Sequence, residues 1–270
     1  MKVWVNGRIA DAKGAIDAND RGVTLGDGIF ETLAIVDGAP RRFDRHMARL
    51  NNGAAVLGIE LSEDEETLIG AVKNICTAEG VTEGSARITL LRGPAPRGVL
   101  PPATAESTLM ISAAAGMVGN AAPVEAIVAT TTRRNERSPL AQVKSTNYLD
   151  AVIAVREASN AGAGDAILLN TRDMVAEATA ANVFCRFGEE LVTPPVSDGA
   201  LPGIMRACVM NAETVIERSI SADEFRGADE VFLTSSLSIR PVVRIDGKVI
   251  GDGRAGPAAA RLKDLPRRAV

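Results

Sequence analysis

The sequence predicts an α+β protein made of two lobes. In the first part of the chain, short apolar stretches separated by Asn-Gly and Asp-Gly turns accompany two amphipathic helices. A stretch of small residues then leads to a second run of strands and hairpins. Tight turns of this kind join antiparallel strands, so hairpins rather than repeated βαβ units should build both lobes. We therefore expect a small N-terminal α/β lobe over residues 1–115, a linker over 116–122 and a larger lobe with a curled, mostly antiparallel sheet over 123–270.

Composition narrows the class of protein. The chain has 270 residues, of which 46% are hydrophobic and 24% charged, and its net charge is −4. Interspersed charges of both signs disfavour nucleic acid or an anionic membrane as the main partner. No segment has the pattern of a signal peptide or a membrane span. The three cysteines are far apart and odd in number, which favours a reducing compartment over a disulfide framework, so we expect a cytoplasmic protein.

The single histidine, His46, excludes several kinds of site. A histidine-rich metal site is impossible, and the cysteines lack the paired spacing of a zinc site. A hydrolase triad would need His46 as its base, but cationic side chains flank it and the chain has no Gly-x-Ser-x-Gly motif. We therefore interpret His46 as a packed or capping residue and expect no metal.

The first lobe should open with a hairpin whose strands, 3–5 and 8–10, flank an Asn-Gly turn. In residues 25–32, glycines alternate with larger side chains before a strand that reaches Ile35. Glycines at such spacing let a backbone approach a ligand, although a turn followed by a bulged strand explains the same pattern.

Two helices follow in the first lobe. The first should span residues 43–57, because its apolar residues recur at helical spacing. Arg45 and Arg49 lie four apart on an adjacent stripe, where they could bind one anion or simply face solvent. The second helix should span about 63–79, between an N-cap at Ser62 and a stop at Gly80. Strands over 85–92 and 109–113 then enclose a proline-rich loop that presents Arg97.

The second lobe should begin with a buried strand over 126–131, followed by a helix that starts near Leu149 and closes at Gly162. Lys144 precedes this helix, and Val143 is its apolar neighbour. Partial desolvation there would favour the neutral amine, a nucleophile toward carbonyl groups. A surface lysine beside a helix start has the same sequence signature, so Lys144 needs partners before it can be assigned.

Further hairpins run through residues 165–193. Glu177 lies among small residues in this region, and a buried carboxylate requires a cationic partner. Residues 201–206 should open a helix that continues to about Glu217. Gly203 at its start would leave backbone N–H groups pointing at whatever binds there, for which phosphate is well suited, unless it is a plain cap. A strand over 230–234, a hydroxyl-rich loop and a final strand follow.

Six motifs, in this order along the chain, resemble the class IV pyridoxal-phosphate aminotransferases. This fold-type-IV family includes branched-chain and D-amino-acid aminotransferases and aminodeoxychorismate lyase. The resemblance extends from Val3 to about Gly253. The motifs are residues 25–32, 46–50, 144–148, 177–184, 201–206 and 234–237. Their order and spacing imply a two-domain fold-type-IV enzyme that uses pyridoxal 5′-phosphate.

The resemblance also implies roles for individual residues. Lys144 matches the Schiff-base lysine, which moves a proton between the substrate Cα and C4′ of the cofactor. Glu177 matches the carboxylate that pairs with the pyridine nitrogen and keeps it protonated. Arg49 matches the arginine that binds the phosphate. Further cofactor contacts are implied for Tyr148, for the backbone of Ile204 and Met205, and for Ser235 and Ser236. Met205 stands where the family often has threonine, and Ala178 where it commonly has glycine.

The implied reaction is transamination between an amino acid, or an amine, and a 2-oxo acid. Arg97 is a candidate ligand of the substrate carboxylate or an exposed loop residue, and Phe30 is a candidate pocket wall. Because the corresponding loop reaches the neighbouring subunit in the family, a homodimer is implied. The alternative is a lyase that makes p-aminobenzoate and pyruvate from aminodeoxychorismate, because residues 201–206, residues 234–237 and the Arg97-Gly98 pair resemble that branch. Residues 135–140, by contrast, resemble the transaminase branch. A non-catalytic binding protein is the third hypothesis, and the substrate's handedness stays open.

Overall fold

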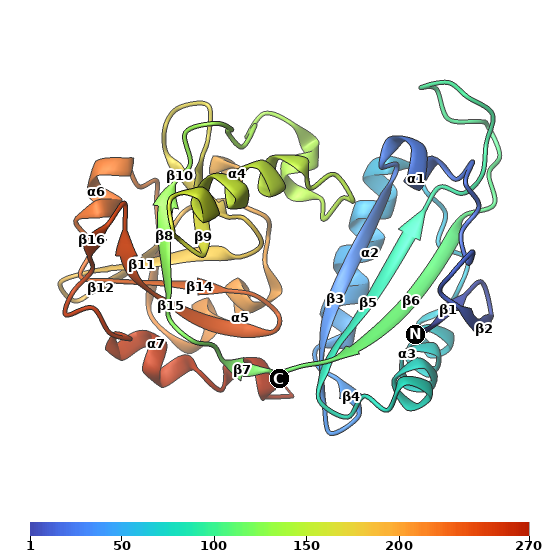
Figure 1. Cartoon of the computed structure of the whole chain (residues 1–270), viewed down its shortest axis with the longest axis horizontal. Helices are drawn as coiled ribbons and strands as arrows, with labels where there is room; N and C mark the ends of the chain where they lie inside the picture. The colour runs from blue at the N-terminus through green and yellow to red at the C-terminus, as the bar shows by residue number, and fades with distance from the viewer. Residues whose placement is uncertain (270) are drawn as a thin grey trace. The chain divides into compact units, whose positions relative to one another are not determined.

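The computed structural model describes residues 1–269, and the chain forms two compact units (Figure 1). Unit 1 contains Met1–Val118, Val143–Asn147 and, near the end of the chain, Ala269, whereas unit 2 contains Gly119–Gln142 and Tyr148–Arg268. The five residues around Lys144 thus belong to the N-terminal unit, although the sequence analysis assigned all of residues 123–270 to the second lobe. Val270, the last residue of that expected lobe, lies outside the described residues.

Unit 1 is built on a six-stranded antiparallel sheet with the order β2-β1-β6-β5-β3-β4. The predicted N-terminal hairpin is confirmed, and Asn6 and Gly7 take the left-handed conformations that a tight turn needs, with φ of 42° and 89°. The strands are β1 (Lys2–Val5), β2 (Arg8–Asp11), β3 (Gly28–Val36), β4 (Ala39–Pro40), β5 (Gly84–Leu91) and β6 (Thr108–Ala115).

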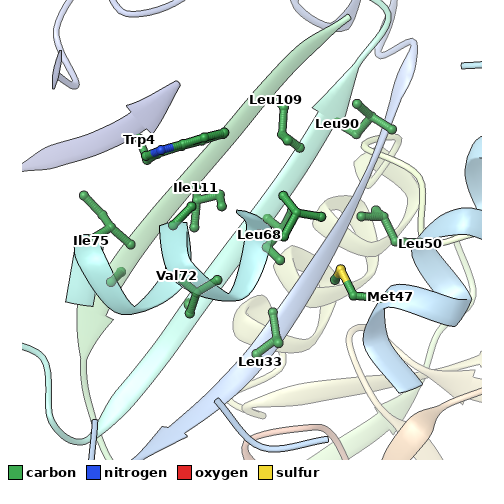
Figure 2. Packing of buried hydrophobic residues seen from close by; sticks show 14 of the residues in the cluster. Trp4, Leu33, Met47, Leu50, Leu68, Val72, Ile75, Leu90, Leu109 and Ile111 are labelled. Atoms are coloured by element: carbon green, nitrogen blue, oxygen red, sulfur yellow. The ribbon is translucent and has the colours of Figure 1, made fainter. Parts of the chain in front are cut away.

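The helices of unit 1 are α1 (Arg21–Leu25), α2 (Phe43–Leu57) and α3 (Glu65–Glu79). The bounds of α2 are those predicted. The predicted N-cap Ser62 is wrong, because the carboxylate of Asp64 accepts the cap bond from the Thr67 N–H at 2.8 Å. Figure 2 shows how residues of α2 and α3 pack against one face of the sheet. The labelled core residues are Trp4, Leu33, Met47, Leu50, Leu68, Val72, Ile75, Leu90, Leu109 and Ile111.

Unit 2 contains a mixed sheet with the order β10-β9-β8-β15-β14-β11-β12-β13, and β7 and β16 also pair with β15. The pairs β8–β9, β8–β15, β7–β15 and β12–β13 are parallel, and the other pairs are antiparallel. The strands are β7 (Gly119–Asn120), β8 (Val124–Val128), β9 (Asp165–Leu169), β10 (Val175–Ala178), β11 (Asn182–Phe187), β12 (Glu190–Thr193), β13 (Val215–Glu217), β14 (Glu230–Thr234), β15 (Ser238–Ile245) and β16 (Lys248–Val249).

One helix of unit 2 is shorter than the sequence predicted. The helix after Gly203, α5, ends at Ala212 rather than near Glu217, because Val215–Glu217 form β13 and pair in parallel with β12. The helices of this unit are α4 (Leu149–Asn160), α5 (Ile204–Ala212), α6 (Ala222–Arg226) and α7 (Pro257–Leu262), and short 3-10 turns occupy Pro139–Gln142, Val196–Asp198 and Leu265–Arg267. No helix in the described part of the chain is long and apolar enough to cross a membrane.

Glu157 in α4 anchors the chain that leaves β8. Its carboxylate accepts hydrogen bonds of 2.6–3.2 Å from the N–H and hydroxyl groups of Thr130 and Thr131. Burial raises the pKa of Glu157, but these bonds together outweigh it and lower the pKa to about 2. We expect Glu157→Gln to reduce the free energy of unfolding at pH 7 by about 1 kcal/mol, less than the pKa shift alone suggests because the site is partly open to solvent.

The stabilisation by Glu157 should depend on pH. Because the folded-state pKa lies below the ordinary value of 4.5, the contribution is complete above pH 4.5 and is lost as the pH falls toward 2. Urea unfolding of the wild type and Glu157→Gln at pH 7 and pH 3 checks this, with Glu189→Gln in an exposed turn as the control. An equal difference at both pH values would contradict the prediction.

Candidate active site

Lys144 lies in the short segment of unit 1 that docks against the start of β3. The Lys144 carbonyl accepts a hydrogen bond from the Phe30 N–H at 2.9 Å, and the Gly28 carbonyl accepts one from the Thr146 N–H at the same distance. The neighbouring Val143 is buried in the core of unit 1. The main chain at Lys144 is therefore held by hydrogen bonds, so the point from which its side chain extends is well defined.

The Lys144 side chain shares an aromatic ring with a second cation. Lys144 Nζ lies 4.5 Å from the centroid of the Phe30 ring, and the guanidinium carbon of Arg87 lies 3.5 Å from the same centroid. Phe30 pairs with Thr89 across β3 and β5, so Arg87, two residues before Thr89, projects from the same face of the sheet. An aromatic ring attracts cations to its face. The structure thus brings the predicted residues Phe30 and Lys144 together and adds Arg87, which the sequence analysis missed.

The other face of β3 carries a buried carboxylate. Glu31 is 1% exposed and accepts hydrogen bonds from Arg49 Nε and Nη2, both at 2.7 Å. His46 Nδ1 lies 2.6 Å from Glu31 Oε2. His46 and Arg49 are one turn apart on α2, so their side chains reach the same point. His46 is therefore a packed residue, as the sequence analysis expected, and Arg49 is oriented by a residue that the sequence analysis did not identify.

Charges in this buried cluster follow from its geometry. Burial raises the pKa of Glu31, but the hydrogen bonds from Arg49 and His46 outweigh that effect and hold the pKa below its usual range. Burial lowers the pKa of the His46 ring. We assign an ion pair between Glu31 and Arg49, with neutral His46 donating through Nδ1–H. The two-point contact with Glu31 fixes the plane of the Arg49 guanidinium, and its binding of phosphate stays a prediction.

In unit 2, Glu177 has an arginine partner. Glu177 Oε1 lies 3.0 Å from Arg134 Nε, and Glu177 Oε2 accepts a hydrogen bond from the Leu201 N–H at 2.9 Å. Arg134 also donates to the carbonyls of Gly199 at 3.2 Å and Ala141 at 3.0 Å. The sequence required a cation for Glu177 if it were buried, and its side chain is only 12% exposed. Arg134 was missed because only the fold brings it to Glu177.

The start of α5 has the features of an anion site. Gly203 occupies the N-cap without a side-chain cap bond, and the N–H groups of Ile204 and Met205 in the first turn have no intrahelical acceptor. A Cβ at Gly203 would lie 1.8 Å from Asn182 Oδ1. Asn182 is itself held by the hydrogen bond from its Nδ2 to the Leu201 carbonyl at 2.8 Å. Only glycine fits here without a rearrangement, and N–H groups without an intrahelical acceptor suit a phosphate.

The hydroxyl-rich loop begins at the end of β14. Ser235 Oγ accepts hydrogen bonds from the N–H groups of Leu237 and Ser238, both at 3.2 Å, so the turn is internally braced. Thr234 pairs with Asn182 of β11, the residue that contacts Gly203. Within the described residues, Thr234 Oγ1 is buried and has no hydrogen-bond partner. An unsatisfied buried hydroxyl costs about 1–3 kcal/mol, so this atom fits a site whose missing acceptor is a ligand oxygen.

The remaining predicted residues keep their assigned roles as predictions. Tyr148 occupies the N-cap position of α4 in unit 2, with φ of −109° and no side-chain cap bond. Ser236 is half-buried next to Ser235. Arg97 is exposed in the loop between β5 and β6 of unit 1. Among the residues described, no cluster of three or more His, Cys, Asp or Glu side chains is arranged to hold a metal ion.

Gly203→Ala tests the anion site at α5. The added Cβ should displace the Asn182 side chain and weaken its bond to Leu201, which narrows the space in front of the helix start. We expect phosphate-bearing ligands to bind about tenfold more weakly, the effect of losing about one good hydrogen bond. Isothermal titration with pyridoxal 5′-phosphate measures this, and Gly70→Ala, where a Cβ meets nothing within 4 Å, is the control. Unchanged affinity would contradict the prediction.

Several known proteins resemble this chain over most of its length. The profile of the family described as amino-transferase class IV matches residues 28–245. A D-alanine aminotransferase of Bacillus licheniformis is 35% identical over 284 residues, covering 100% of this chain and 97% of that protein. Among solved structures, a putative 4-amino-4-deoxychorismate lyase from Legionella pneumophila is 32% identical, with a TM-score of 0.87 over 96% of this chain and 97% of the other.

A second solved structure carries a derivative of the expected cofactor. It is the T.th. branched-chain amino acid aminotransferase complexed with N-(5′-phosphopyridoxyl)-L-glutamate, which is 26% identical, with a TM-score of 0.89 over 98% of this chain and 92% of the other. The family match covers most of the chain, and the 35% identical relative is matched over nearly its whole length. This chain therefore belongs to the class IV aminotransferases, and it is an enzyme with their fold-type-IV architecture.

Proposed function

We propose that this aminotransferase binds pyridoxal 5′-phosphate and that Lys144 is the residue that attaches to it. When bound, this cofactor supplies an aldehyde and a ring that withdraws electrons from the substrate Cα. The observation that carries the proposal is the position of Lys144. Its main chain is hydrogen-bonded to β3, and its amine lies beside the Phe30 ring. The unsatisfied hydroxyl of Thr234 and the start of α5, which has no side-chain cap, support a phosphate ligand.

The other residues hold and tune the cofactor. Glu177, which is held by Arg134 and the Leu201 N–H, is the partner of the pyridine nitrogen. Lys144 accepts the proton from the substrate Cα and delivers it to C4′ of the cofactor. The phosphate ligands that we propose are Arg49, Ser235, Ser236 and the N–H groups of Ile204 and Met205, and Tyr148 is the partner of the cofactor's phenolic oxygen.

The substrates that we propose are an amino acid and a 2-oxo acid, both of which carry a carboxylate that needs a cation. Two arginines of unit 1 are candidates. Arg97 is exposed in its loop, as a residue that captures a carboxylate must be. Arg87 is exposed and is stacked on Phe30 beside Lys144. Phe30 would form a pocket wall, since the centroid of its ring lies 4.5 Å from Lys144 Nζ and 3.5 Å from the Arg87 guanidinium carbon.

The lyase reaction is the second candidate, because one of the solved neighbours, at 32% identity, is named as a putative 4-amino-4-deoxychorismate lyase. Lys144 would serve either reaction. We nevertheless place transamination first, because relatives across the full length of the chain are named as D-alanine and branched-chain aminotransferases.

A homodimer in the cytoplasm is part of the same proposal. Val99 and Leu100, at the tip of the loop after β5, are 85% and 87% exposed, which is costly for two adjacent apolar side chains unless another surface covers them. The three cysteines are free and buried, consistent with a reducing compartment.

The decisive experiment combines a spectrum with an assay. The purified protein is incubated with pyridoxal 5′-phosphate, and its visible spectrum is recorded before and after addition of D-alanine, L-leucine or an (R)-amine, each with a 2-oxo acid. A cofactor band that changes with one donor, together with transfer of its amine, supports the proposal. A spectrum with no cofactor band, or one unaltered by Lys144→Ala, would reject it. Release of pyruvate from aminodeoxychorismate without amine transfer would replace transamination by the lyase reaction.

A further inference from the structure

The loop between β5 and β6, which contains Arg97, is tied down at its base by backbone bonds. The Arg21 N–H donates to the Gly93 carbonyl at 3.0 Å, and the Ala95 N–H donates to the Asn19 carbonyl at 3.3 Å. Asp20 and Pro94 form an isolated β-bridge between the same two segments. These contacts stop just before Arg97, so they cannot by themselves fix its main chain.

The Arg21 side chain supplies a second anchor beyond Arg97. Arg21 is 4% exposed, and its Nη1 and Nη2 donate to the carbonyls of Gly98 and Val99, both at 2.7 Å. Arg97 therefore lies between two restrained points, the bond at Ala95 and the bonds at Gly98 and Val99. A long loop held on both sides of one residue presents that residue in a narrow range of positions.

Asp27 in turn holds Arg21. Its Oδ2 accepts from Arg21 Nε at 2.8 Å and from Arg92 Nε at 2.7 Å, and Arg92 also donates to the carbonyls of Leu57 at 2.6 Å and Gly58 at 2.8 Å, at the end of α2. The Asp27 carboxylate thus connects two buried arginines whose side chains extend in different directions. Arg21 extends to the loop, whereas Arg92 extends to the helix.

We infer that Arg21 is a positioning residue, which fixes the loop under Arg97 and thereby sets the affinity for the substrate carboxylate. The inference rests on the role proposed for Arg97. A planar guanidinium can bond to Asp27 and two carbonyls at once, and a lysine ammonium cannot reproduce that fork. Without these three contacts of the Arg21 guanidinium, the loop would have to become ordered each time substrate binds. That cost would weaken substrate binding and leave the rate of the chemical step largely unchanged.

The test is a double-mutant cycle in the holoenzyme. We expect Arg21→Lys to raise KM for the amino acid by about tenfold, since a misplacement of about 1 Å can cost about a hundredfold, and to change kcat less than about threefold. In an Arg97→Gln background, Arg21→Lys should cause no further rise in KM. Arg92→Lys is the matched control, because Arg92 shares Asp27 but contacts α2, and it should leave KM unchanged.

Hydrogen exchange supplies a readout that does not depend on catalysis. Arg21→Lys should accelerate exchange of the amides of residues 97–100, next to its bonds to Gly98 and Val99, while Arg92→Lys should not. A rise in KM that persists in full in the Arg97→Gln background, or faster exchange without any change in KM, would overturn the inference while leaving the role of Arg97 intact. If Arg97→Gln alone leaves KM unchanged, the role of Arg97 fails and the inference fails with it.

Discussion

Turnover of every amino donor is expected to fall by at least about a thousandfold when Lys144 is replaced by arginine. A guanidinium stays protonated at neutral pH, so it can neither attack an aldehyde nor take the proton from the substrate Cα. The replacement keeps a long polar side chain beside Phe30 and the main-chain bond from Phe30 to residue 144, so the fold should survive. The measurement is the initial rate of 2-oxo acid formation with the best donor, at saturating cofactor.

Two controls separate chemistry from folding. Lys73→Arg changes an exposed lysine on α3 and should leave the rate unchanged. Lys144→Ala should recover part of its activity when a small primary amine such as methylamine is added, because a diffusible base can replace the missing proton acceptor. Full activity of Lys144→Arg would remove Lys144 from the catalytic role.

The largest effect on stability is expected at Glu31. Glu31→Gln removes the charge that neutralises Arg49, whose side chain is only 12% exposed, and also weakens the partner of His46. Breaking a buried ion pair from one side typically costs about 3–5 kcal/mol, because the remaining charge is left without compensation. We expect a loss of about 3 kcal/mol in the free energy of unfolding of unit 1. Trp4, the single tryptophan of the chain and part of the unit 1 core, reports this transition by fluorescence during urea unfolding.

A double variant distinguishes lost charge balance from lost packing. Glu31→Leu combined with Arg49→Met removes both charges and should recover much of the stability lost in Glu31→Gln, since hydrophobic replacement of a buried pair is often neutral. If Glu31→Gln is as stable as the wild type, the assigned ion pair does not contribute to the fold.

Acidification should expose the contribution of His46. Burial lowers its pKa below the ordinary value of 6.5, so the neutral ring belongs to the folded state and the unfolded chain binds the proton first. The stability that His46 provides is therefore complete above pH 6.5 and is lost as the pH falls through the lower folded-state pKa. The urea midpoint followed by Trp4 should fall between pH 7.5 and pH 5, and His46→Gln should reduce this slope. If the urea midpoint of His46→Gln depends on pH as strongly as that of the wild type, protonation of His46 is not coupled to unfolding.

Elements governed by local pattern were predictable from the sequence. The amphipathic period placed both ends of α2, and the Asn-Gly turn placed the β1–β2 hairpin. The end of α5 was not predictable in this way. Residues 215–217 continue a plausible helical pattern, and only their parallel pairing with β12, a contact distant in sequence, converts them to a strand. The wrong prediction of Ser62 as the N-cap has a local cause. Ser and Asp are both good N-caps, and the hydrogen bond from the Thr67 N–H goes to Asp64.

The residues of the candidate site also fall into those with a local sequence pattern and those defined only by contacts between distant parts of the chain. Lys144, Glu177 and Arg49 could be named as candidates because each lies in a motif with its own spacing, and their roles stay predictions. Arg87 and Arg134 could not be named, because no local sequence pattern marks either residue. Their importance follows from contacts between residues distant in sequence, Arg87 with Phe30 of the neighbouring strand and Arg134 with Glu177 of β10. Glu31 lies inside a motif that had been noted for its glycines, and the alternation of side chains along β3, with Phe30 on one face and Glu31 on the other, was the signal available for it.

The return of residues 143–147 to unit 1 has a consequence for the order in which the protein can assemble. β3 is complete early in the chain, but its partner at Phe30 and Gly28 is supplied only when Lys144 and Thr146 arrive. During synthesis on a ribosome, residues 1–118 must therefore wait, with that edge open, until the chain has emerged past Asn147. The segment that contains Lys144 thus joins the N-terminal unit late, and a chain truncated before residue 143 would leave Gly28 and Phe30 of β3 without these main-chain partners.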